Sequence, residues 1–347
     1  MKATFFAGVL RRLSIAAVLC TALAPVPSIA TPQNLYVSDA FRILEITPTG
    51  TQTTFAEKGL NNPRGLAFDN AGTLFVATTP GSGVAKGTLL RFNPAGSGTT
   101  VGTVPDNTFL EGVATNIGNV FVMALDTTQL PSPGTIYKFS SGGGPPNPFG
   151  SVPGQGFGLE FDDAGNLFAA DFSDGAIFQF SANGTRTLFA TVGTTFPNGG
   201  ITGPIDLAFD NSGNLFVTIG PSFGAPPNTP GEIIEITPQG VQTVFATGLP
   251  SEIFGLAFDM SGNLFASFRG GPIALAQILE FTPEGVESVF ASDLVSPTFL
   301  TFGPPSQTGV PDGGTTFMLL GTAIASLGFF RRTCAASLAD PSAATSR

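Results

Sequence analysis

The sequence predicts an all-β protein, a six-bladed β-propeller of four-stranded antiparallel blades. One phrase, of the form Gly-Leu-Ala-Phe-Asp-x-x-Gly-Asn-Leu-Phe-Val-Ala, recurs at intervals of 46 to 49 residues, a period typical of propeller blades. Each copy contains two short apolar runs joined by a Gly-containing turn, which is the pattern of a β-hairpin. The copies, one of them degenerate, begin at Gly65, Gly112, Gly158, Asp206 and Gly255.

Two further apolar runs follow each hairpin. In the third run, of which 233–236 and 278–281 are examples, a polar residue stands between apolar neighbours, as expected for alternation on a sheet. A Thr-Pro-x-Gly turn then leads into a fourth run, such as 241–246. Four runs per copy predict four antiparallel strands in each blade.

The two ends of the repeat region predict how the ring closes. Residues 34–39 match a second strand and no first strand precedes them, whereas 299–302 match a first strand and no second strand follows. The C-terminal strand is therefore expected to complete the first blade, which gives five internal blades and one composite blade over residues 31–303. Such closure protects strand edges that would otherwise be exposed.

The N-terminus has the features of a secretory signal peptide over residues 1–30. Basic residues precede an apolar run from Leu13 to Leu23, and a small-residue cleavage site ends at Ala30. The chain has two cysteines, Cys20 and Cys334, and neither lies in the repeats. No disulfide is therefore expected in the propeller.

The C-terminus predicts a second addressing segment. A linker over 304–314 ends in Val-Pro-Asp-Gly-Gly, an apolar membrane segment with an Arg pair follows over 315–332, and 333–347 is expected to be a disordered tail. An uninterrupted apolar run of this length is short for a transmembrane helix, which needs roughly 20 residues. The order of motif, apolar run and Arg331-Arg332 resembles C-terminal sorting signals of the PEP-CTERM type. That resemblance implies export, membrane association and an exosortase-type processing enzyme as a partner.

Charge and composition exclude several function classes. Residues 31–314 contain 8 basic and 23 acidic side chains, a net charge of −15, so nucleic acid is not an expected partner. The chain contains no His, which removes imidazole as a base, an acid or a metal ligand. Ser-His-Asp and Cys-His mechanisms are therefore excluded.

Several aspartates recur at equivalent positions. Those that follow the first strand, Asp69, Asp162, Asp210 and Asp259, precede a Gly-containing turn, where Asp side chains bond the local backbone. A structural role is therefore favoured for them. Asp39, Asp171 and Asp174 lie at the ends of second strands, on the face where loop lengths vary. They are better candidates for a site, although turn capping is favoured for each of them too.

The repeat units resemble NHL-type propellers and, more loosely, the regucalcin and gluconolactonase family of lactonases. The resemblance implies a divalent metal at the mouth of the central channel, held by side chains just before the innermost strands. Only Glu111, in Leu-Glu-Gly-Val, matches that family's Glu-Gly-Pro pattern. In this chain the positions just before the innermost strands, at the channel mouth, are Arg64, Glu111, Phe157, Ile205, Phe254 and Thr298.

Two readings of this mouth are open. In the first, the alignment with the family is shifted by one residue, which brings Asp206 to the channel near Glu111 and Asp171. These three side chains would then be ligands for Ca²⁺, which prefers six to eight oxygens, or for another divalent metal. Alternatively Glu111 pairs with Arg64 of the neighbouring blade, because a lone buried carboxylate would be costly. The second reading is favoured, and no cofactor is expected.

The leading functional hypothesis is a secreted, cell-surface-targeted propeller that acts as a binding or structural module with an unidentified surface or matrix partner. The alternative is a metal-dependent hydrolase of the lactonase type, with Glu111, Asp206 and Asp171 as ligands and a metal-bound water as nucleophile.

Overall fold

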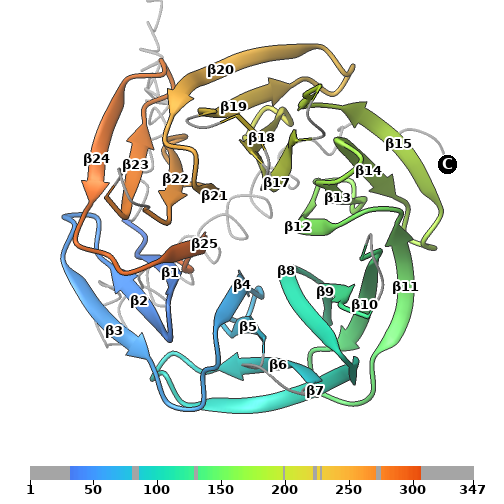
Figure 1. The fold of residues 1–347 in the computed structure, drawn as a ribbon. Helices are drawn as coiled ribbons and strands as arrows, with labels where there is room; N and C mark the ends of the chain where they lie inside the picture. The colour runs from blue at the N-terminus through green and yellow to red at the C-terminus, as the bar shows by residue number, and fades with distance from the viewer. Residues whose placement is uncertain are drawn as a thin grey trace, which may run out of the picture. The chain divides into compact units, whose positions relative to one another are not determined.

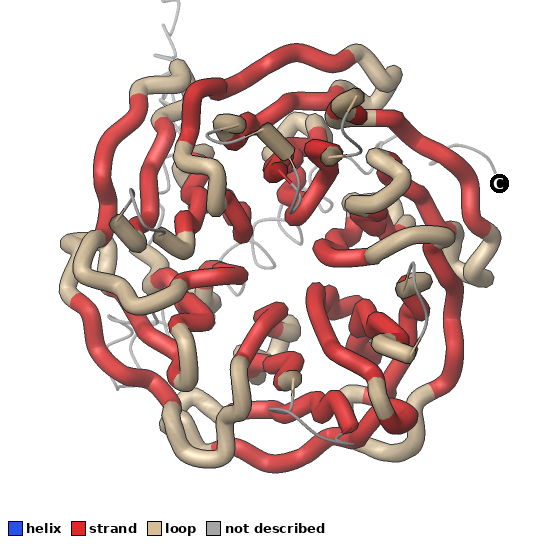
Figure 2. The backbone as a smooth tube through the Cα atoms, viewed as in Figure 1, coloured by secondary structure: helices blue, strands red, loops and turns tan. Residues whose placement is uncertain are grey.

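A computed structural model describes residues 32–79, 86–128, 132–197, 200–221, 225–226, 229–270 and 275–305. Every regular element among these residues is a β-strand (Figure 2). No helix in the described residues is long and apolar enough to cross a membrane. The predicted signal peptide, the Val-Pro-Asp-Gly-Gly motif, the apolar segment and the tail lie outside the described residues.

The strands form radial sheets around a central channel, which confirms the predicted all-β propeller (Figure 1). The first sheet contains β25 (Pro297–Phe302), β1 (Leu35–Asp39), β2 (Arg42–Ile46) and β3 (Gln52–Ala56). The eight-stranded sheet contains β4 (Pro63–Phe68), β5 (Leu74–Thr78), β6 (Lys86–Phe92), β7 (Gly98–Asp106), β8 (Thr108–Asn116), β9 (Asn119–Asp126), β10 (Gly134–Ser140) and β11 (Asn147–Val152).

Three further sheets complete the ring. The third contains β12 (Gly156–Phe161), β13 (Leu167–Asp171), β14 (Ala176–Phe180) and β15 (Arg186–Thr191). The fourth contains β16 (Thr194–Thr195), β17 (Ile201–Phe209), β18 (Leu215–Pro221), β19 (Gly231–Ile236) and β20 (Gln242–Leu249). The last contains β21 (Ile253–Phe258), β22 (Leu264–Phe268), β23 (Gln277–Phe281) and β24 (Glu287–Ala291).

Ring closure follows the prediction from the chain ends. Strand β25 pairs antiparallel with β1, with Leu35 opposite Phe302 and Val37 opposite Leu300. The C-terminal strand thus completes the sheet that begins the propeller, and β1 is not left as an open edge. The count of six blades stays a prediction, because β4–β7 and β8–β11 join into one sheet through the pairing of Lys86 with Thr108.

The repeated phrase folds as its pattern predicts. In the first full copy Phe68 lies opposite Leu74 and Leu66 opposite Val76, so the two apolar runs form a hairpin. The Asp69 carboxylate accepts hydrogen bonds from the backbone N–H groups of residues 71 and 73, at 2.9 and 2.8 Å. Gly72 has a φ of 77°, which an L side chain rarely adopts. The structural role expected for the turn aspartates is confirmed, since Asp162, Asp210 and Asp259 make equivalent bonds.

Aromatic side chains join neighbouring strand groups at equivalent places. The Phe168 ring on β13 contacts Phe189 on β15 and Phe209 on β17, with ring centroids 5.0 and 5.1 Å apart and edge-to-face geometry. Such pairs contribute about 0.5–1.5 kcal/mol each beyond the burial of their area. The phenylalanines of the phrase therefore form the interface between successive strand groups. The same arrangement centres on Tyr36, Phe121, Phe216 and Phe265.

Glycine at the start of the inner strands lets them approach one another. A Cβ atom on Gly112 would lie 2.4 Å from the carbonyl oxygen of Phe157, and one on Gly65 would lie 2.4 Å from that of Glu111. Neither backbone oxygen can move without displacing its own strand. The recurrent Gly of the phrase is therefore a requirement of close packing around the channel, and its replacement by Asp206 in one copy is an exception with consequences for the site.

Candidate functional site

The central channel is a cavity of about 290 Å³ lined by the inner strands β4, β8, β12, β17, β21 and β25. The six predicted mouth residues lie on these same strands, one or two residues before the stretch that lines the channel. In all six inner strands the ladder is interrupted at this point, as between Pro63 and Leu66 on β4. Bulges of this kind re-aim side chains, so the mouth is built on the irregular ends of the inner strands.

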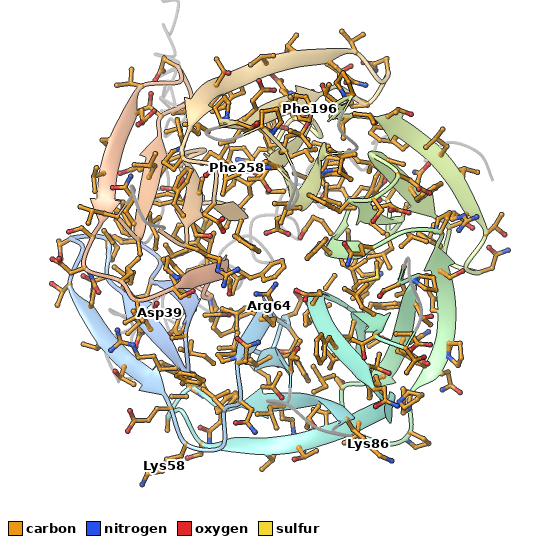
Figure 3. The ribbon with its side chains drawn as sticks, viewed as in Figure 1. Asp39, Lys58, Arg64, Lys86, Phe196 and Phe258 are labelled. Carbon is orange, nitrogen blue, oxygen red and sulfur yellow. The ribbon has the colours of Figure 1, made fainter. Side chains whose placement is uncertain are left out.

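An ion pair occupies the mouth. Arg64 donates to Glu111 Oε2 from Nη2 at 2.6 Å and from Nε at 2.8 Å. Both residues are buried, with 8% and 7% of their surface exposed. The Arg64 guanidinium also lies over the rings of Phe254 and Phe299, at 5.5 and 5.7 Å from their centroids. The predicted pairing of Glu111 with Arg64 is confirmed, and Figure 3 shows Arg64 beside the channel.

Hydroxyl groups from second strands hold the backbone of the mouth. The Ser38 hydroxyl donates to the carbonyl oxygen of Arg64, and the Ser267 hydroxyl donates to that of Thr298. Thr218 Oγ1 donates to the Phe254 carbonyl at 2.7 Å. These three hydroxyl residues have no exposed surface. The sequence signal for this role is the Ser or Thr that ends the second run at residues 38, 218 and 267, which was not among the predicted site residues.

Asp206 links two inner strands. Its Oδ2 accepts a hydrogen bond from the backbone N–H of Leu256 on β21 at 2.9 Å, and its own N–H donates to Thr218 Oγ1 at 2.9 Å. The absence of a side chain at Gly158 makes room for it, because a Cβ atom there would lie 2.5 Å from Asp206 Oδ1. Burial raises the pKa of Asp206 to about 7, against the lowering effect of two backbone N–H groups.

Asp39 and Asp171 anchor loops, as the turn-capping interpretation expects. Asp171 accepts from the N–H of Gly154 at 2.8 Å and from that of Asp174 at 3.2 Å. Asp39 Oδ1 accepts from the N–H groups of Val295 and Ser296 at 2.9 and 2.6 Å. Both carboxylates are fully buried, and burial raises the pKa of Asp171. Their recorded partners are groups of the fold itself.

The three carboxylates considered as metal ligands therefore have separate partners. Glu111 bonds Arg64, Asp206 bonds the backbone of β21, and Asp171 bonds the loop before β12. Within the described ranges, no group of three or more Asp, Glu or Cys side chains is placed to hold a metal ion. The residues present do not fit a Ca²⁺ site, which requires several oxygens around one point.

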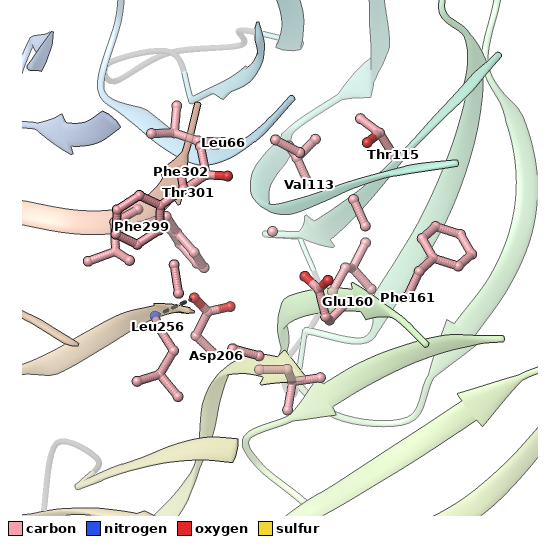
Figure 4. Close-up of a pocket in the computed structure, with 18 of the residues that line it drawn as sticks. Leu66, Val113, Thr115, Glu160, Phe161, Asp206, Leu256, Phe299, Thr301 and Phe302 are labelled. Atoms are coloured by element: carbon pink, nitrogen blue, oxygen red, sulfur yellow. Dashed lines mark hydrogen bonds between the residues drawn. The ribbon is translucent and has the colours of Figure 1, made fainter. Parts of the chain in front are cut away.

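One ionisable residue of the channel was not among the predicted site residues. Glu160 on β12 lines the channel cavity together with Asp206 on β17, and both carboxylates point into it (Figure 4). These two are the ionisable side chains among the described residues that line the cavity. Burial, and then the charge of Asp206, raise the pKa of Glu160 to about 8, while the Phe161 N–H lowers it. The available signal was Glu at the position where four copies of the phrase have Ala.

Comparison with known proteins supports the sorting signal and the fold. Residues 309–334 match the model of the VPDSG-CTERM motif, which confirms the predicted PEP-CTERM-like signal and implies export and surface anchoring. A search of curated proteins found no match.

Several solved structures resemble this chain at low sequence identity. A protein of unknown function from Bacteroides caccae is 13% identical over 79% of this chain and 99% of its own, with a TM-score of 0.52. A catalytically inactive virginiamycin B lyase from Staphylococcus aureus, solved with quinupristin, is 16% identical over 78% of this chain and 87% of its own, with a TM-score of 0.50. A gluconolactonase from Xanthomonas campestris is 20% identical over 53% of this chain and 64% of its own, with a TM-score of 0.42. The first two of these likenesses show the fold alone.

Proposed function

We propose that this protein is an exported, cell-surface-targeted β-propeller that acts as a binding or structural module. The observation that carries the proposal is the occupation of the channel mouth by the Arg64–Glu111 pair, whose two charges neutralise each other in a buried position. A general base or metal ligand must be available to a reacting group. Glu111 is instead engaged by two hydrogen bonds of the fold.

The metal-dependent hydrolase alternative requires a different arrangement of the mouth. Glu111 would have to leave Arg64, and Asp206 would have to leave the Leu256 N–H. Each change leaves a buried donor, the Arg64 guanidinium or the Leu256 N–H, without its hydrogen-bond partner. An unpaired buried group costs about 1–3 kcal/mol when it is neutral and more when it is charged. These costs favour the binding or structural module.

The targeting half of the proposal predicts a processing defect. Replacing Pro311 and Asp312 by Ala in the full chain should prevent recognition by an exosortase-type enzyme, so that the chain accumulates unprocessed in the membrane fraction. The measurement is immunoblotting of cell fractions from a Gram-negative host that has an exosortase, with an antibody to the propeller. Ser306→Ala, in the same linker, is the matched control and should be processed normally. Identical size and fractionation of the double variant and the wild type would overturn the targeting proposal.

A further inference from the structure

A second cavity lies beside the channel mouth. It has a volume of about 350 Å³ and lies between β12, β17 and β21. Most of its wall is apolar, and the Phe157 ring packs edge-to-face on Phe172 with centroids 5.6 Å apart. The polar residues of its wall are Gln155, Ser251 and Glu252. Pockets with an apolar wall and few polar groups are the usual form of small-molecule sites.

The ring of Phe254 connects this pocket to two arginines. Phe254 lines the pocket, and the guanidinium groups of Arg269 and Arg64 lie over the same ring, at 4.9 and 5.5 Å from its centroid. The backbone N–H of Arg269 also donates to the carbonyl of Glu252, another wall residue, at 3.0 Å. Phe254 therefore belongs both to the wall of the pocket and to the cationic edge of the mouth.

The two arginines differ in how their charge is balanced. Arg64 is paired with Glu111, whereas within the described residues Arg269 has no carboxylate oxygen within 4.0 Å. The side-chain hydrogen bond recorded for Arg269 runs from Nε to Ser296 Oγ at 3.3 Å. Burial, and then the neighbouring charge of Arg64, lower the pKa of Arg269, while Glu252 and Glu111 raise it. A half-buried cation of this kind would be stabilised by an added anion.

We infer that this pocket binds a small organic anion with an apolar body, a carboxylate carried on an aryl or alkyl group. The apolar body lies against Phe157, Phe172 and Phe254, and the acid group accepts hydrogen bonds from the Arg269 guanidinium. Planar donors on Arg suit a carboxylate, and a guanidinium that already lies over an aromatic ring is held in orientation by it. The inference rests on the proposed binding function and gives that function a ligand class.

The test is titration of 3-phenylpropanoate into the purified full chain by calorimetry, with the uncharged 3-phenylpropanamide as the paired probe. The carboxylate should bind at least tenfold more tightly than the amide. Arg269→Gln should weaken carboxylate binding at least tenfold, and Phe157→Ala should weaken both probes. Glu252→Gln should strengthen carboxylate binding, since it removes an exposed like charge from the pocket wall.

A matched control is available for the arginine. The guanidinium of Arg186, on the outer strand β15, lies over the Phe178 ring at 4.8 Å. Neither residue lines the pocket, so Arg186→Gln removes the same kind of contact and should leave binding unchanged. Thermal unfolding of each variant shows that it is folded. Absence of carboxylate binding by the wild type, equal binding of the amide, or full binding by a folded Arg269→Gln variant would each overturn the inference. These results leave the sorting experiment untouched, so failure of the pocket and failure of the targeting proposal are distinguishable.

Discussion

The Glu111→Ala variant is expected to lose about 3–5 kcal/mol of unfolding free energy, because it leaves the buried Arg64 guanidinium without its carboxylate. Arg64 donates two hydrogen bonds to one oxygen atom of Glu111, Oε2, with N···O distances of 2.6 and 2.8 Å. Phe254 and Phe299 flank the guanidinium and cannot accept its hydrogen bonds. The measurement is urea unfolding of the wild type and the variant.

A double-mutant cycle isolates the interaction energy of the two side chains from the effects of the single substitutions. Arg64→Met should be destabilising in the same range, whereas Arg64→Met combined with Glu111→Leu should recover most of the loss, since it replaces both charges with apolar groups. Arg42→Met is the comparison. Arg42 is 34% exposed, and its buried partner Asp39 keeps the N–H groups of Val295 and Ser296 when Arg42 is removed, so the loss should be nearer to the value of about 1 kcal/mol for an exposed pair. A single-variant loss below that value for Glu111→Ala would contradict the assignment of the mouth to a buried ion pair.

Stability should also fall as the pH rises from about 5 to 8. In the folded protein the pKa values of Glu160 and Asp206 are raised to about 8 and about 7, whereas their ordinary values are 4.5 and 3.8. Between the ordinary and the raised pKa values, the folded state retains protons that the unfolded chain releases, so the unfolding free energy decreases as the pH rises. The stabilising contribution is complete below the ordinary values and is lost once the pH passes the raised ones. The total change should be on the order of a few kcal/mol.

The pH dependence can be assigned with one conservative substitution. Glu160→Gln removes the carboxylate with the higher pKa from the channel, and should flatten the curve between pH 7 and 8 in particular. Glu287→Gln changes an exposed carboxylate on the outer strand β24 and should leave the curve as it is. Urea unfolding at intervals between pH 5 and 9 provides the comparison. Parallel curves for the wild type and Glu160→Gln would show that the channel carboxylates do not carry the effect.

Features that recur in most copies of the phrase could be predicted from the sequence. The hairpins, the turn aspartates and the closing strand all follow from local patterns and their repetition. The Arg64–Glu111 pair could also be predicted, because equivalent positions 47 residues apart lie side by side at the channel. These successes depend on one rule, that residues at the same place in successive copies are neighbours in space.

Departures from the phrase were harder to interpret. Glu160 replaces an Ala of the inner strand, and whether that position faces the channel depends on the bulge before it, which the apolar pattern does not reveal. Asp206 replaces a Gly, and its bond to Leu256 spans two strand groups. The position of Arg269 over Phe254 depends on the path of the chain after β22. For Glu160 and Asp206 the neighbouring group lies on another copy of the repeat, and local alternation carries no information about it.

The most direct test of a mouth occupied by its own ion pair is the thermal unfolding midpoint of the purified full chain in excess Ca²⁺ and then in chelator. The midpoint should be the same in both, with Glu111 bound to Arg64 throughout. A divalent ion bound at a hundred times its dissociation constant would stabilise the protein by about 2.7 kcal/mol. A shift of that size, abolished by Glu111→Gln, would contradict the binding or structural module and favour a metal-dependent enzyme.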